Sequence, residues 1–327
     1  MLLDLSIIIV NWKSADYLRE CLRSVYAYTH EIGFEIVVID NASYDGVGEM
    51  LAAEFPGVVF IQSAENLGFA KANNCAYRRT AGEFLLFLNP DTEVTDGALD
   101  GMVAHLRKEP GAAMVGPCLL NTDGSVQISC VQAFPTITNQ LLNSALLRRL
   151  FPRWKGWGMT ALYSGHEKAT AVDAVSGACL MIRRKDFESI GLFTETYFMY
   201  FEDMDLSYKV AKAGRRVDYL PGCRVTHHGG KSSGKQQSHF VSLQQKEAVL
   251  QFFRRTRGPV YCGVYRVAIA VAAAGRVCLA LILAPVWRGG EARNWRSAAG
   301  KWAAVFQWAT GWKNLAAIAA PANEHSA

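Results

Sequence analysis

The chain has 327 residues, half of them hydrophobic, with a net charge of +5 and eight cysteines. This length can bury a large core and can hold one big domain or two smaller ones. Because no two cysteines form a Cys-x-x-Cys pair, the sequence argues against a disulfide framework and a zinc knuckle, and it favours a reducing compartment.

The first hundred residues alternate between strand-like and helix-like segments. The apolar run at residues 5–10 follows Asp4 rather than basic residues, which predicts a first strand and not a signal peptide. Ser14 is the expected N-cap of a helix up to about residue 29. Further strands are predicted at residues 34–39, 58–62 and 84–88, with helices ending near residues 55 and 80 between them. This alternation predicts an α/β fold with a right-handed, doubly wound, mostly parallel sheet.

Polar side chains follow each of these predicted strands, where ligands bind in open α/β sheets. Because this half lacks both Gly-x-Gly-x-x-Gly and the P-loop motif, dinucleotide and P-loop folds lose their main support. A nucleotide diphosphate could still bind if Mg²⁺ or Mn²⁺ bridged it to a carboxylate. Each polar cluster could also be a simple turn. The polar and glycine residues in question are Asn11, Asp40, Asn41, Ser43, Asp45, Asn66, Gly68, Asn89 and Asp91.

The second half is less regular. A helix is predicted at residues 96–108, a short strand at 112–115 and a helix at 137–150, within an irregular stretch from 117 to 170. A strand at 172–182 is interrupted at Ser176-Gly177, where glycine indicates close approach by a ligand or another backbone.

Two polar clusters close this half of the chain. Glu202, Asp203 and Asp205 follow an aromatic block that contains Tyr200, and they begin a predicted helix, whose N-terminus stabilises negative charge. His227 and His228 precede a glycine pair and a basic loop. Either histidine could complete the coordination of a metal on Asp91, or be a surface turn residue.

Taken together, seven segments resemble the inverting glycosyltransferases of family 2, and more narrowly their bacterial rhamnosyltransferase-like branch. The segments occur in the family's order over residues 4 to 235. They are Ser6-Ile7-Ile8-Ile9-Val10-Asn11-Trp12, Val38 to Gly46, Glu65 to Ala70, Leu88-Asn89-Pro90-Asp91-Thr92, Ser176-Gly177-Ala178, Phe201 to Leu206, and His227 to Ser232.

The resemblance implies a GT-A fold that binds a nucleotide sugar. Asp40 would contact the base, and Asp91 would be the metal-binding acid of an Asp-x-Asp motif whose first position is Asn89 here. Asp203 matches the general base, and His227, or alternatively His228, matches a contact to metal or diphosphate. Glu202 and Asp205 would orient the base. The donor side would be lined by Asn11, Asn41, Ser43, Asp45, Asn66 and Gly68, and the acceptor side by Ser176, Gly177 and Tyr200.

The activity expected from the resemblance is inverting sugar transfer assisted by Mg²⁺ or Mn²⁺. The favoured donor is dTDP-L-rhamnose, with a UDP- or GDP-sugar as the alternative, and the favoured acceptor is a polyprenyl-diphosphate-linked saccharide in cell wall or O-antigen synthesis. Two other classes stay open: a metal-dependent nucleotidyltransferase, which more often has a glycine-rich basic loop near its first strand, and a non-catalytic membrane scaffold.

The last part of the chain differs in composition from the rest. Residues 251–313 contain ten Lys and Arg but one acid, Glu291, which favours an anionic membrane surface over a nucleic acid as partner. The apolar stretch 259–287 is long enough to cross a bilayer. It contains Arg266 and Arg276, about 80° apart around a helix at 100° per residue.

An interfacial helix or helical hairpin is therefore favoured over a clean crossing. The alternative is a hairpin that packs on the catalytic domain or joins subunits in a homo-oligomer. The predicted organisation is a catalytic domain at 1–250, with donor and acceptor halves at 1–116 and 117–250, and a helical tail at 251–327. The predicted location is the cytoplasmic face of the plasma or inner membrane, with peripheral or monotopic attachment through residues 251–313.

Overall fold

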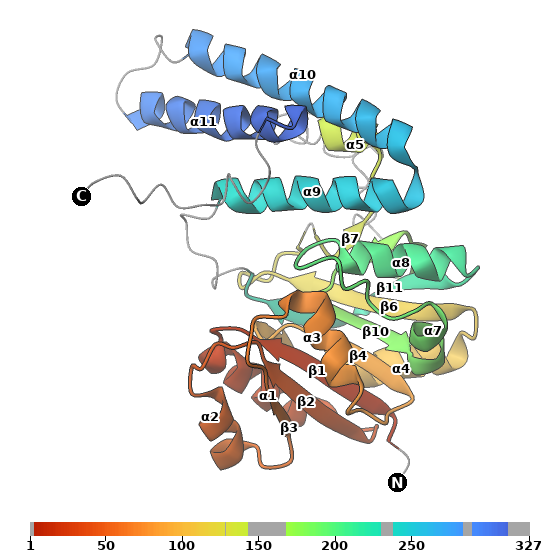
Figure 1. Ribbon diagram of the computed structural model, residues 1–327. Helices are drawn as coiled ribbons and strands as arrows, with labels where there is room; N and C mark the ends of the chain where they lie inside the picture. The colour runs from red at the N-terminus through yellow and green to blue at the C-terminus, as the bar shows by residue number, and fades with distance from the viewer. Residues whose placement is uncertain (1–2, 128, 143–167, 230–237, 284–289, 313–327) are drawn as a thin grey trace. The chain divides into compact units, whose positions relative to one another are not determined.

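The computed structural model describes residues 3–127, 129–142, 168–229, 238–283 and 290–312 (Figure 1). Contacts within the chain divide it into two compact units. The first comprises residues 1–134 and 149–232 and contains the predicted catalytic residues, so it is here called the catalytic unit. The second, here called the helical unit, comprises residues 135–148 and 233–327. The sequence-based boundary at 250 stays a prediction, since the helix that it cuts belongs to the second unit by contacts.

The catalytic unit is built on a nine-stranded sheet whose first four strands are parallel. Their spatial order is β3-β2-β1-β4, as expected for the doubly wound α/β fold predicted from the sequence. Every side chain of β4 is buried, because β4 lies in the interior of the sheet between β1 and β10. The bounds are β1 (Leu5–Asn11), β2 (Phe34–Asp40), β3 (Val59–Gln62) and β4 (Phe84–Leu88).

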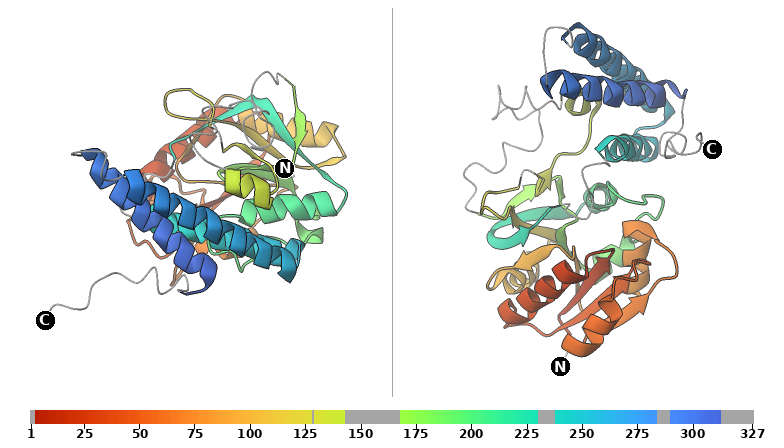
Figure 2. Two further views of the ribbon diagram at one scale, coloured as in Figure 1. Left: turned by 90° about the horizontal axis from the view of Figure 1, so that it is seen from above. Right: turned by 90° about the vertical axis from the view of Figure 1, so that its left-hand side faces the viewer.

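Helices cover both faces of this sheet (Figures 1 and 2). Alternation along β1 shows the two layers, since Ile7 and Ile9 pack in one apolar cluster and Ile8 and Val10 in the other. The first cluster includes residues of α1 (Ala15–Tyr28), α2 (Val47–Glu54) and α4 (Ala98–Lys108). The second includes residues of α3 (Gly68–Tyr77), α7 (Arg184–Ser189) and α8 (Glu202–Lys212).

The other half of the sheet contains antiparallel strands. β10 (Cys179–Arg183) runs antiparallel to both β4 and β6 (Ala112–Leu120), and β11 (Arg216–His227) runs parallel to β6. β5 (Thr92–Val94) and β8 (Thr170–Val172) pair with β11, and β7 (Val131–Gln132) pairs with β9 (Ala174–Val175). The β11–β5 pairing brings His227 opposite Thr92, one residue after Asp91.

The start of α1 differs from the prediction. Ser14 does not cap the helix with its side chain; its Oγ donates to the carbonyl of Trp12 at 3.0 Å. The N–H of Ala15 instead donates to Asp45 Oδ2 at 3.1 Å. Asp45 comes from the loop after β2, so the first helix is anchored by the same polar segment that the sequence predicts as a donor loop.

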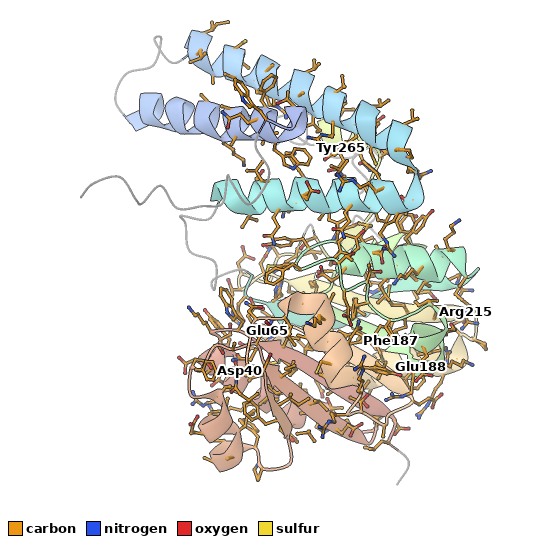
Figure 3. All side chains as sticks on the ribbon, viewed as in Figure 1. Asp40, Glu65, Phe187, Glu188, Arg215 and Tyr265 are labelled. Atoms are coloured by element: carbon orange, nitrogen blue, oxygen red, sulfur yellow. The ribbon has the colours of Figure 1, made fainter. Side chains whose placement is uncertain are left out.

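The helical unit consists of α5 (Ile137–Leu142), α9 (Ser238–Thr256), α10 (Pro259–Leu283) and α11 (Gly290–Thr310). The remainder of the helix predicted at 137–150 lies outside the described residues. Tyr265 on α10 points toward α9 (Figure 3), where its ring centroid lies 5.1 Å from that of Phe253. Arg266 donates to the carbonyls of Trp308 and Ala309 on α11 at 2.8 and 2.9 Å.

Among the described residues, one helical stretch, Pro259–Ile282 of α10, is long and apolar enough to cross a membrane. Only 22% of its most apolar window is buried within the structure. Most of the surface of this apolar window is therefore not covered by the neighbouring helices.

Candidate active site

The carboxyl ends of β1 and β2 are joined by a network centred on Asp40 (labelled in Figure 3). Asp40 has no exposed surface. Its carboxylate accepts hydrogen bonds from Asn11 Nδ2 at 2.8 Å and Gln62 Nε2 at 2.8 Å, from the N–H groups of Ser43 and Tyr44 at 3.0 and 3.2 Å, and from the Ser43 hydroxyl.

The protonation state of Asp40 follows from this network. Burial acts to raise its pKa, but the hydrogen bonds from Ser43, Gln62 and Asn11 outweigh burial and hold the pKa below its usual value. An ionised Asp40 therefore fixes the turn at residues 41–45. Because its oxygens are already engaged, direct contact between Asp40 and a nucleotide base would require this turn to open.

A second network holds the loop after β3 against the end of β2. Asn41 Nδ2 donates to Asn66 Oδ1 at 2.8 Å and to the Gly68 carbonyl at 3.2 Å, while Asn41 Oδ1 accepts from the Leu67 N–H at 2.8 Å. Gly68 has φ +73°, and a Cβ there would lie 2.3 Å from the Phe198 carbonyl oxygen. This glycine is needed because the Phe198 backbone passes so close to it.

The loop after β4 places Asp91 beside His227. His227 Nε2 lies 3.3 Å from Asp91 Oδ1, and both side chains are largely buried. Gln127 contacts His227 through both ends of its amide: Nε2 donates to the His227 carbonyl at 2.6 Å, and Oε1 lies 2.9 Å from His227 Nδ1. A carbonyl only accepts, so the first bond fixes the amide orientation and makes Nδ1 the protonated nitrogen. The Nε2 lone pair of a neutral His227 then faces Asp91.

The adjacent His228 is directed elsewhere. Its Nε2 lies 2.6 Å from Glu93 Oε1, and its ring packs against Tyr17 at 5.7 Å between centroids. Of the two histidines that the sequence left open, the structure therefore brings His227 to Asp91.

The chemistry of this pair fits a divalent cation. A carboxylate and an imidazole whose far nitrogen is hydrogen-bonded are standard metal-binding partners. Among the described residues no group of three or more His, Cys, Asp and Glu side chains forms a complete site. The remaining positions of a cation on Asp91 and His227 would therefore be available to phosphate oxygens and water.

Asp203 lies at the start of α8, against the break between β9 and β10. Its Oδ2 accepts from the Gly177 N–H at 2.8 Å and its Oδ1 from the Met204 N–H at 2.7 Å. Ala178, the next residue, accepts from the Asn89 N–H at 2.9 Å. Residues 177–178 thus connect Asp203 to the loop that carries Asp91.

Two neighbouring carboxyl groups at this point both have raised pKa values. Glu202 is buried, with 7% of its surface exposed, and its Oε2 has no hydrogen-bond partner among the described residues. Burial, together with the charge of Asp203, raises the pKa of Glu202 to about 8. Burial also raises the pKa of Asp203, against hydrogen bonds from Gly177 and Met204 that favour the anion. At neutral pH the pair can therefore share one proton.

Other predicted site residues have local structural contacts. Asp205 accepts from the Thr194 hydroxyl at 2.6 Å and lies 3.4 Å from Lys209 Nζ, so it ties α8 to the preceding loop. Ser176 Oγ accepts from the Ala178 N–H at 3.3 Å. Tyr200 is half-buried, and burial followed by the charge of Glu202 raises its pKa.

The backbone is strained in these loops. Non-glycine residues rarely adopt positive φ, and strain of this kind clusters at functional sites. Here Lys13 follows β1, Ala42 and Tyr44 follow β2, and Tyr200 and Phe201 precede α8, with φ between 50° and 71°. Five left-handed residues thus lie in three loops that contain or adjoin predicted site residues.

Gln127 is the site residue that the sequence did not reveal. It lies in an irregular segment, and it reaches His227 across 100 positions of sequence. In the structure this polar side chain is only 8% exposed. Burial of that kind cannot be recognised from a single sequence.

The fold and the site define an α/β enzyme with carboxylates gathered at one edge of its sheet. The sequence model of glycosyl transferase family 2 matches residues 6–191, more than half of the chain, so the chain belongs to this family and is a glycosyltransferase. The match runs from β1 through β10 and α7 and ends before α8, so it does not include Asp203 or His227.

Curated relatives cover more of the chain. An N-acetylglucosaminyl-diphospho-decaprenol L-rhamnosyltransferase from Mycobacterium tuberculosis is 28% identical over 268 residues, which cover 78% of this chain and 85% of the relative. Rhamnosyltransferase WbbL from Escherichia coli is 27% identical over 232 residues, which cover 68% of this chain and 82% of the relative.

Solved structures share the fold. Mannosyltransferase PcManGT from Pyrobaculum calidifontis, in complex with GDP-Man and Mn²⁺, superposes with a TM-score of 0.56 at 18% identity and covers 96% of this chain and 89% of its own. GalNAc-T7 with UDP, GalNAc and Mn²⁺ has a TM-score of 0.55 at 20% identity and covers 76% of this chain and 48% of its own. These similarities confirm the predicted GT-A fold.

Proposed function

We propose that the protein transfers L-rhamnose, with inversion, from dTDP-L-rhamnose to a hydroxyl of a polyprenyl-diphosphate-linked saccharide during cell-surface polysaccharide synthesis. Family membership supports sugar transfer and disfavours the nucleotidyltransferase and scaffold alternatives. The names of the two rhamnosyltransferase relatives support the donor sugar, and the name of the mycobacterial relative supports a polyprenyl-linked acceptor.

The observation that carries the proposal is the connection through residues 177–178. It holds the proposed base, Asp203, and the proposed metal-binding loop at one edge of the sheet. A sugar whose diphosphate is bound at Asp91 would have its anomeric carbon near this connection. The turn at 41–45 and the loop at 66–68 would line the nucleoside. Asn11 and Asp40 would fix the turn through their hydrogen bonds at the strand ends.

Asp91 and His227 would hold Mg²⁺ or Mn²⁺ on the donor diphosphate. When bound, the cation supplies positive charge that stabilises the departing nucleoside diphosphate. Gln127 keeps the proton on His227 Nδ1, so that Nε2 presents its lone pair to the site.

Asp203 would remove the proton from the acceptor hydroxyl as its oxygen attacks the anomeric carbon. The hydrogen bonds from Gly177 and Met204 orient the carboxylate. A proton shared with Glu202 would leave the pair with a single negative charge, so that no second charge repels the attacking oxygen. A single displacement with one base and no protein nucleophile gives inversion.

The helical unit would attach the enzyme to the cytoplasmic face of the membrane. Large apolar side chains of α10 are more than half exposed and recur at helical spacing, as Val260, Val264, Val267, Val271 and Ile282. An apolar stripe of this kind fits a lipid surface, where a polyprenyl-linked acceptor resides. A second copy of the chain is the alternative partner for this stripe.

The experiment is a panel of dTDP-, UDP- and GDP-sugars, with Mn²⁺ or Mg²⁺ and a polyprenyl-diphosphate-linked N-acetylglucosamine acceptor. Release of nucleoside diphosphate should require acceptor and cation and be fastest with dTDP-L-rhamnose. Faster turnover of a UDP- or GDP-sugar would replace the donor, and product with retained anomeric configuration would refute the single displacement.

A further inference from the structure

The helical unit places two cations against one tryptophan ring and a third close enough to act on one of them by its charge. Lys246 lies on α9, Arg276 on α10, and Lys301 on α11, next to Trp302. The guanidinium carbon of Arg276 lies 4.2 Å from the centroid of the Trp302 ring, and Lys246 Nζ lies 5.8 Å from it. Three helices thus contribute one cation each to a single half-buried cluster, here called the Trp302 cluster.

No acid balances the Trp302 cluster among the described side chains, where none of its three cations forms an ion pair. Glu247 is the one acid of the helical unit whose side chain is described, and it is engaged by Arg254 at 3.3 Å and by the Trp308 indole N–H at 2.7 Å. Burial, with the charges of Arg276 and Lys301, lowers the pKa of Lys246 to about 8. The like charges therefore oppose one another.

We propose that Lys246, Arg276 and Lys301 bind the phosphate group of an anionic membrane lipid. Bringing like charges together in a half-buried site destabilises the free protein. An anion bound among them attracts each cation and so offsets their mutual repulsion. Arg and Lys bind phosphate through charge-assisted hydrogen bonds, and basic pockets between membrane-associated helices bind lipid head groups. The proposal rests on the membrane attachment proposed above, but not on the donor or the sugar transferred.

Binding is tested with the full chain and vesicles, without nucleotide sugar. Co-sedimentation with phosphatidylcholine vesicles containing phosphatidylglycerol is compared for wild type, Lys246→Met, Arg276→Gln and a control, Arg257→Gln. Arg257 is exposed and follows α9, so its replacement removes the same charge outside the cluster. Each cluster variant should bind about tenfold more weakly than the control, as expected for a lost charged hydrogen bond.

Equal loss in the cluster variants and in Arg257→Gln would overturn the proposal, because net charge alone would then explain the binding. So would an equal loss on vesicles of pure phosphatidylcholine, which carry no net charge. A parallel set containing polyprenyl diphosphate in place of phosphatidylglycerol identifies the source of the phosphate. A tenfold cluster effect on either lipid supports the site, and its absence on both contradicts it.

Stability separates a binding site from a structural one. Lys246→Met keeps the length of the side chain and removes the repulsion from Arg276 and Lys301, so its melting temperature without lipid should equal or exceed that of wild type. A fall of several degrees would show that Lys246 stabilises the helical unit, which would refute the binding role. Binding of the nucleoside diphosphate in the presence of cation, which needs no acceptor, shows whether the catalytic unit stays intact.

Discussion

Replacing Glu202 by Gln should stabilise the protein, and more so as the pH rises. Glu202 is buried beside Asp203, and its pKa is raised from 4.5 to about 8 by burial and by the charge of that neighbour. Between these two values the folded chain keeps a proton that the unfolded chain releases. The free energy of unfolding of the wild type therefore falls as the pH rises through this window.

The magnitude follows from the two pKa values. At about 1.36 kcal/mol for each pH unit above the unfolded value, carrying a protonated Glu202 costs about 3 kcal/mol at pH 7. Glutamine has nearly the shape of a protonated glutamic acid and carries no proton to lose. Since about 1 kcal/mol corresponds to roughly 2–4 °C for a domain of this size, Glu202→Gln should gain several degrees at pH 7 and little at pH 5.

The assay is thermal unfolding between pH 5 and 8, with Glu49→Gln as the control. Glu49 is also a first-turn glutamate, on α2, but it is exposed, so its replacement should give no gain that grows with pH. A Glu202→Gln variant with the same stability as wild type at pH 5, 7 and 8 would refute the protonated state assigned to Glu202.

Three further predictions follow from particular contacts. Gln127→Ala should weaken Mn²⁺ binding by about 10- to 100-fold, measured by the electron paramagnetic resonance signal of free Mn²⁺, and equal affinity in wild type and Gln127→Ala would contradict the positioning role. Gly68→Ala should lower the melting temperature by several degrees, because its Cβ would lie 2.3 Å from the Phe198 carbonyl oxygen, and an unchanged melting temperature would show that the loop shifts freely. Val267→Asp should reduce sedimentation with membranes at least tenfold, with Arg257→Gln as the milder comparison, and undiminished sedimentation would favour a protein partner for the apolar stripe.

Strands β1, β2 and β4 were predictable because each is a short apolar run that is largely buried. The edge strand β3 is partly exposed, and its apolar run at residues 58–61 still marked it. Residues 84–88 were predicted as a strand and form β4 with those bounds. Their polar successors were predictable for the same reason, since parallel strands place their carboxyl ends at one edge. Family resemblance then supplied the roles of Asp91, Asp203 and His227, which remain predictions.

The second half of the sheet was harder to predict. β11 contains Pro221 and Gly222, and its pairing with β6 shifts register between Leu220 and Arg224, so no continuous apolar alternation marks it. β5 has only three residues. The contacts that depend on these strands could not be predicted either, above all the Asp91–His227 pair and its support by Gln127, because they join residues a hundred or more positions apart.

Glu202 and Asp205 illustrate the limit of reading charge from sequence. Both were expected to orient Asp203, and both lie in the first turn of α8. The structure turns Asp205 toward Thr194 and Lys209, whereas Glu202 is buried without a hydrogen-bond partner for its Oε2 among the described residues. Helical spacing alone does not reveal which carboxyl group loses its charge, since that depends on burial.

The central claim is that Asp203 is the base, and the most direct measurement is the turnover number of Asp203→Asn with saturating donor, cation and polyprenyl-linked acceptor. We predict a loss of about 10²- to 10⁴-fold, with the dissociation constant for the nucleoside diphosphate within a few-fold of wild type. Glu202→Gln should retain most activity at pH 7 in the same assay. Turnover of Asp203→Asn within tenfold of wild type would contradict the account.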